Sequence, residues 1–157
     1  MLLALDISTS CTGYCIFDED KLVDIGSINL SKHKGLFSKA AQVKSEIIRL
    51  GNEYQIDNVA VEENLQAFRP GLSSAKTLMT LAQFNGVVRW ICHERLDVPV
   101  VSINVNAARK NVGLKINKKD KTKTTKEKVL DWVAVELPQI KWPTKILKSG
   151  PNKGKER

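Results

Sequence analysis

The hydrophobic positions of the chain follow two different periods, which together predict an alternation of strands and helices. Short apolar or alternating runs, bounded by polar residues, predict five β-strands. These strands are expected at residues 2–6, 12–17, 22–30, 56–62 and 98–103. The turn between the second and third runs consists of four charged residues, so we expect the first three strands to form an antiparallel meander.

Apolar residues spaced three and four apart predict helices in the remaining stretches. The helices are expected at residues 36–54, from about 74 to 95, at 105–111 and from about 125 to 137. Ser73 or Ser74 can cap the second helix, and Pro138 ends the last. We place the apolar residues of the last helix on its inner side: Val129, Trp132, Val133, Val135 and Leu137.

This order of elements predicts an α/β fold with a mixed five-stranded sheet flanked by helices. The first three strands are antiparallel, and the two later strands join through helical crossovers and run parallel to the first. The carboxyl ends of strands 2–6 and 56–62 then lie at the same edge of the sheet. Asp6 ends the first of these strands and Glu62 ends the second, so the two carboxylates should meet.

Two acids at neighbouring strand ends suggest a shared cation, because a carboxylate ending a buried strand is costly without a positive partner. Oxygen ligands suit Mg²⁺ or Mn²⁺, and such an ion between carboxylates suggests phosphate chemistry. Asp6 could instead cap the amides of the following turn. Glu63 could replace Glu62 as the ligand, because alternation does not separate adjacent positions. The hydroxyl groups of Ser8, Thr9 and Thr12 either position substrate phosphate or water, or satisfy the turn backbone.

The formal charge of +8 is distributed unevenly along the chain. Residues 1–108 carry 10 Lys and Arg against 12 Asp and Glu, whereas residues 109–157 carry 15 against 5. The last third therefore predicts binding of a polyanion, most simply nucleic acid; a solvated basic loop is the alternative. The basic loop contains Lys115, Lys118, Lys119, Lys121, Lys123 and Lys126. Aromatic residues are few, at 6%, which favours contacts to the backbone over base stacking.

Composition excludes several classes of protein. A chain of 157 residues with 42% hydrophobic and 27% charged residues is typical of one globular domain. No apolar stretch approaches the roughly 20 residues that a membrane span needs, and no signal peptide is evident. Three cysteines without paired spacing indicate free thiols, and a cytoplasmic location is expected.

With these features the chain resembles the RuvC-like Holliday junction resolvases of the RNase H-like superfamily, most closely the phage-type members. The resemblance rests on Asp6 followed by Ser8-Thr9-x-x-Thr12-Gly13, and on Val59-Ala60-Val61-Glu62. It also rests on the block at residues 105–113 and the lysine loop after it. The resemblance implies a homodimer that cuts four-way DNA junctions, in the host cytoplasm if phage-encoded, with two Mg²⁺ or Mn²⁺ ions per active site.

The resemblance also implies roles for individual residues. Asp6 and Glu62 correspond to the first two metal-binding acids of the family. Basic residues near the scissile phosphate correspond to Arg109, Lys110, Lys123 and Lys126. A residue that wedges against junction bases corresponds to Leu65 or Phe68.

The chain departs from the family pattern at its C-terminal end. The family has a last helix bearing one or two further acids that complete the metal site, and the sequence to Arg157 contains no such helix. We expect a nuclease domain at residues 1–148 and a disordered basic tail at 149–157, which resembles the linker before a missing helix.

Two functional alternatives follow. One is a non-catalytic module that binds branched DNA through an incomplete metal site. The other is an actin-like or sugar-kinase lobe, for which 157 residues are too few.

Overall fold

The computed structural model describes residues 1–63, 74–117, 120 and 122–140, in which five strands and four helices alternate as the sequence predicts. The strands are β1 (Leu2–Asp6), β2 (Cys11–Asp18), β3 (Lys21–Asn29), β4 (Asn58–Glu62) and β5 (Val100–Ile103). The helices are α1 (Leu36–Glu53), α2 (Ala75–Leu96), α3 (Val105–Asn111) and α4 (Thr125–Glu136). The chain divides into two compact units, Met1–Ala108 and Arg109–Arg157.

The first unit contains the whole sheet, whose strand order is β3-β2-β1-β4-β5. The pairs β1–β2 and β2–β3 are antiparallel, whereas β1–β4 and β4–β5 are parallel. The mixed five-stranded α/β sheet predicted from the sequence is therefore confirmed. β1 is the middle strand and ends at Asp6. Asp6 therefore has a neighbouring strand on each side, β2 and β4.

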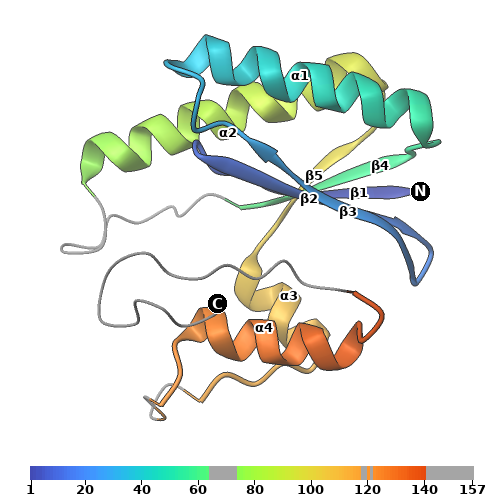
Figure 1. Cartoon of the computed structure of the whole chain (residues 1–157), viewed down its shortest axis with the longest axis vertical. Helices are drawn as coiled ribbons and strands as arrows, with labels where there is room; N and C mark the ends of the chain where they lie inside the picture. The colour runs from blue at the N-terminus through green and yellow to red at the C-terminus, as the bar shows by residue number, and fades with distance from the viewer. Residues whose placement is uncertain (64–73, 118–119, 121, 141–157) are drawn as a thin grey trace. The chain divides into compact units, whose positions relative to one another are not determined.

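The core lies between one face of the sheet and helices α1 and α2, which cover that face (Figure 1). Alternate residues of β1 point into it, since Leu3 and Leu5 are buried while Asp6 is exposed. Helix α1 contributes Val43 and Ile47 to the core, at the four-residue spacing that places side chains on one face. The alternation along β1 thus directs Leu5 to the core and Asp6 to the opposite face.

Two strands begin later than the sequence predicts. The ladder of β4 starts at Asn58 and that of β5 at Val100, two residues after the predicted starts. Ile56 is nevertheless buried, and Val98 packs against the core. Both residues bury their side chains before the backbone enters the sheet, so the apolar pattern extends beyond the ladder.

The second unit contains α4, whose start is capped by Thr124. The Thr124 hydroxyl accepts a hydrogen bond from the Glu127 amide at 3.3 Å, and the Glu127 carboxylate accepts one from the Thr124 amide at 2.7 Å. The inner side predicted for this helix is wrong at Val135, which is 76% exposed. The other four residues predicted there are half-buried: Val129, Trp132, Val133 and Leu137. No helix in the described part of the chain is long and apolar enough to span a bilayer.

Candidate metal and phosphate site

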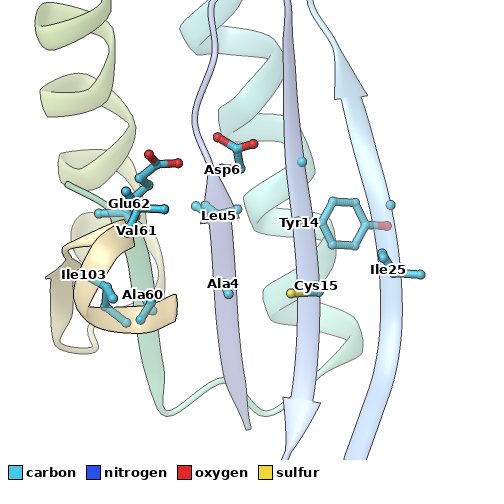
Figure 2. A pocket seen from close by; sticks show the side chains of 14 residues that line it. Ala4, Leu5, Asp6, Tyr14, Cys15, Ile25, Ala60, Val61, Glu62 and Ile103 are labelled. Carbon is cyan, nitrogen blue, oxygen red and sulfur yellow. The ribbon is translucent and has the colours of Figure 1, made fainter. Parts of the chain in front are cut away.

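Asp6 and Glu62 end two neighbouring parallel strands at the same level of the sheet. Leu5 of β1 pairs with Val61 of β4, and Asp6 and Glu62 are the next residues of the two strands. Both side chains are exposed and both line a pocket of about 400 Å³. Figure 2 shows the two carboxylates at the same end of this pocket. The meeting of the two acids that the strand order predicts is therefore present.

Small residues lie next to the two acids in the pocket. Ala4 and Ala60 precede the two acids by two residues on their strands, and the β2 neighbour of Asp6 is Gly13. A residue with no side chain beside Asp6 leaves room around the carboxylate. The strand positions next to the acids thus keep the space above them open.

The turn between β1 and β2 satisfies its own polar groups with hydroxyls. The buried Thr12 hydroxyl accepts a hydrogen bond from the Ser8 amide at 3.4 Å and donates one to the Ser8 carbonyl at 3.1 Å. The Ser10 amide donates to the Ser8 hydroxyl at 3.4 Å. Thr12 therefore has the structural role that the sequence left open. Asp6 does not cap this turn, and among the described residues no side chain donates a hydrogen bond to its carboxylate.

The adjacent acids Glu62 and Glu63 lie in different surroundings. Glu63 accepts a hydrogen bond from the Asn104 side chain at 2.9 Å, and its amide donates to the Ile103 carbonyl at 2.9 Å. Glu62 lines the pocket that contains Asp6, whereas Glu63 is not among the lining residues. The geometry thus favours Glu62 as the partner of Asp6, as the family pattern does.

Two polar contacts that the sequence did not indicate lie beside the acid pair. Asn85 of α2 is 3% exposed, and its amide donates to the Glu62 carbonyl at 3.4 Å. The ammonium of Lys39 in α1 donates to the Thr9 carbonyl in the β1–β2 turn. A polar residue at a buried helical position, one turn before Val88, is the signal that could have identified Asn85. For Lys39 the sequence contains no comparable signal, because the contact joins distant segments.

The donor set fits a divalent cation that prefers oxygen ligands. Two carboxylates on adjacent strands face one pocket, and Mg²⁺ is commonly bound by one or two carboxylates together with substrate phosphate and water. In the described part of the chain, no group of three or more His, Cys, Asp and Glu residues lies close enough to hold a metal ion. Asp6 and Glu62 could thus supply two oxygen ligands to such a cation, with the remaining ligands coming from water and substrate phosphate.

All eight predicted DNA-binding residues belong to the second unit. Lys110, Lys115 and Lys126 are exposed, and Arg109 is partly buried. Lys123 forms an ion pair with Asp131 at 2.7 Å, which raises the pKa of the Lys123 ammonium through a hydrogen bond and charge attraction. Three further lysines of the predicted basic loop (Lys118, Lys119 and Lys121) lie outside the described residues, as do both wedge candidates, Leu65 and Phe68.

Lys128 organises the segment that leads into α4. Its ammonium donates to the carbonyls of Asn117 at 3.0 Å and Asp120 at 2.6 Å, and pairs with the Asp120 carboxylate at 2.8 Å. Hydrogen bonds from Lys128 and Thr122 hold the pKa of Asp120 well below its usual range. Lys128 was not among the predicted DNA contacts, and its bonds to Asn117 and Asp120 give it a structural role.

No protein-family model matches the chain, and no curated protein matches it in sequence. Among solved structures it is similar to Thermus thermophilus RuvC, with a TM-score of 0.60 and 15% identity over 90% of this chain and 82% of that one. It is also similar to T. thermophilus RuvC in complex with a Holliday junction substrate. That match has a TM-score of 0.58 and 14% identity over 69% of this chain and 67% of that one. At these identities the likeness concerns the fold, and the chain therefore has the RNase H-like fold of RuvC.

Proposed function

We propose that the chain is a metal-dependent, structure-specific endonuclease that cuts Holliday junctions and other branched DNA by phosphodiester hydrolysis. The observation that carries the proposal is the position of Asp6 and Glu62 on neighbouring strand ends, facing one open pocket. The RuvC fold supports the choice of substrate, because one of the similar structures contains a Holliday junction substrate.

The acid pair and its surroundings have distinct tasks in this proposal. Asp6, on the middle strand, and Glu62 hold Mg²⁺ or Mn²⁺, two ions per site as in the resembling family. When bound, such ions neutralise the phosphoryl oxygens and generate the attacking hydroxide. Asn85 positions Glu62 by donating a hydrogen bond to the Glu62 carbonyl. Thr12 fixes the turn that follows Asp6. Exposed side chains at the strand ends leave the phosphate free to approach both acids.

The basic residues of the second unit bind the DNA backbone. Arg109 and Lys110 in the last turn of α3, with Lys115 and Lys126, supply positive charge without aromatic platforms. Charge of this kind contacts phosphates and carries little sequence information. Binding should therefore be steeply salt-dependent and should follow the shape of the DNA rather than its sequence.

A homodimer suits a four-way junction, because a two-fold axis relates the two strands that are cut. The surface that supports self-association lies on α1 and α2. Phe37 is 81% exposed and Trp90 is 59% exposed, and together with Gly86 and Val87 they line one shallow groove. Large aromatic side chains with this exposure are typical of interfaces.

Cleavage of a labelled four-way junction tests the proposed function. The wild-type chain should nick the junction only when Mg²⁺ or Mn²⁺ is added, and a linear duplex of the same sequence should be cut far more slowly. Asp6→Asn and Glu62→Gln should abolish nicking while leaving DNA binding intact. Nicking by either variant at the wild-type rate would show that these acids are not the metal ligands.

The second candidate function is a non-catalytic module that binds branched DNA. It is favoured by one observation: the described residues bring only two acids together at the pocket, with no group of three or more potential ligands. Junction binding with no cleavage at any concentration of Mg²⁺ or Mn²⁺ would select this function over the nuclease.

A further inference from the structure

Charge is sorted along the first unit, although its two signs nearly cancel. Residues 25–45 contain four lysines and no acid. The acids of the β2–β3 turn, Asp18, Glu19 and Asp20, lie at the opposite end of the sheet from Asp6, because β2 runs antiparallel to β1. The segment from β3 into α1 is therefore positive, whereas the β2–β3 turn at the far end of the sheet is negative.

The β3–α1 loop lies at the same edge of the sheet as Asp6. Asn29, the last residue of β3, pairs with Cys11, the first residue of β2. The Leu30 amide then donates to the Ser10 carbonyl at 2.9 Å, which joins this loop to the β1–β2 turn. Strands lie 4.7–4.9 Å apart, so β3 is about 10 Å from β1 across the sheet.

The loop is held by its own hydrogen bonds. The Asn29 carboxamide accepts from the Ser31 amide at 3.0 Å and from the Ser31 hydroxyl at 2.6 Å. The His33 amide donates to the Leu30 carbonyl at 3.1 Å, and the His33 ring contacts the Ser38 hydroxyl at 3.3 Å. Lys32 and Lys34 therefore project from a defined backbone, and both side chains are exposed.

Lys39 adds a positive charge at the turn itself. Its partly buried ammonium donates to the Thr9 carbonyl, three residues after Asp6. An ammonium has three donors, and a single carbonyl uses one of them. Lys39 can thus hold the turn and donate to a phosphate oxygen at the same time.

We propose that Lys32, Lys34 and Lys39, here called the basic rim, bind the sugar-phosphate backbone of the DNA strand whose scissile phosphate lies at Asp6 and Glu62. The basic rim is a second DNA contact, carried by the sheet unit itself and separate from the lysines of residues 109–157. The spacing of about 10 Å between β3 and β1 equals the rise of roughly three base pairs along the axis of B-form duplex, at 3.4 Å per pair. The basic rim positions the DNA strand at Asp6 and Glu62. This inference rests on the proposed function.

Fluorescence anisotropy of a fluorescein-labelled four-way junction tests whether the basic rim binds DNA. The affinity is measured in Ca²⁺ over a series of salt concentrations. Each lost phosphate contact lowers the slope of log affinity against log salt by about 0.9. Lys32→Gln/Lys34→Gln should therefore lower the slope by about 1.8 and weaken binding. The matched control is Lys21→Gln, an exposed lysine in the acidic turn at the far end of the sheet, which should leave slope and affinity unchanged.

The outcomes separate the rim from the proposed function. If the wild-type chain cuts the junction in Mg²⁺ but the double variant keeps its slope and affinity, the rim is not a DNA contact and the nuclease assignment stands. An equal change in Lys21→Gln would also overturn the rim, because the effect would then reflect net charge alone. A wild-type chain that neither binds nor cuts the junction would overturn both. Melting curves of the three proteins should coincide, since all the replaced side chains are exposed.

Discussion

Replacing Asp6 with asparagine should stabilise the metal-free protein and remove its response to divalent metal. Asp6 and Glu62 are like charges at the ends of neighbouring strands, and like charges on neighbouring strands destabilise each other. Asparagine has the same shape as aspartate and no charge. If Asp6 serves metal binding, its charge destabilises the folded protein in the absence of metal. If Asp6 instead has a structural role, its charge stabilises the folded protein.

The size of the effect follows from the strand geometry. Two unit charges about 5 Å apart in water interact with about 0.8 kcal/mol, and this high-dielectric value applies because both side chains are exposed. In a chain of this length, 1 kcal/mol moves the melting temperature by about 2–4 °C. Asp6→Asn should therefore melt about 2–3 °C above the wild type in EDTA.

Metal should reverse the order of the two proteins. An ion present at 100 times its dissociation constant stabilises the folded state by about 2.7 kcal/mol, which the wild type gains and Asp6→Asn does not. Differential scanning calorimetry in EDTA, Mg²⁺ and Mn²⁺ measures both effects. Glu63→Gln is the matched control, since Glu63 bonds to Asn104 and does not line the pocket; it should keep the wild-type metal response.

A lower melting temperature for Asp6→Asn in EDTA, with the metal response retained, would refute this reasoning. Asp6 would then be a structural acid, despite the turn hydroxyls that already satisfy the neighbouring amides. Loss of the metal response in Glu63→Gln would instead show that the wrong member of the Glu62–Glu63 pair has been assigned.

Three further predictions concern the surroundings of the site. Asn85→Leu keeps the volume of the buried side chain but removes the hydrogen bond to the Glu62 carbonyl at the end of β4, a loss of about 1–3 kcal/mol that the gain in apolar burial offsets. Junction cleavage should fall at least about tenfold, with little change in melting temperature. An unchanged cleavage rate would show that Asn85 does not position the site. Trp90→Glu should convert dimers to monomers in sedimentation experiments, and a monomeric wild type would contradict the dimer. Iodoacetamide at pH 8 should modify the exposed Cys11 but spare the buried Cys92, whose pKa burial raises to about 12, and mass spectrometry that finds native Cys92 alkylated would contradict the described core.

Much of the fold could be predicted from the sequence because its strands differ clearly in pattern. β1 and β4 are short apolar runs that end in acids, and the helices between later strands require parallel pairing. Hydrophobicity measures burial rather than backbone pairing, so Ile56 and Val98 extended two predicted strands beyond their ladders. The periodicity of α4 likewise failed at one position, since Val135 is exposed whereas the other apolar residues of its predicted inner side are half-buried.

The candidate site was predictable only in part. The strand order sufficed to bring Asp6 and Glu62 together, because parallel neighbours end at one edge. The choice between Glu62 and Glu63 needed the register of β4, which alternation alone does not give. Contacts between distant segments, such as Lys39 with the Thr9 carbonyl, depend on tertiary packing and leave no local signal.

The central claim is that Asp6 and Glu62 together bind a divalent metal ion at the DNA backbone. Crystals of the protein with junction DNA and Mn²⁺ test it most directly, through the anomalous scattering of manganese. We predict an anomalous peak in contact with carboxylate oxygens of both residues and with a phosphate oxygen of the DNA. Manganese bound elsewhere, with Asp6 and Glu62 both away from the ion and the phosphate, would contradict the claim.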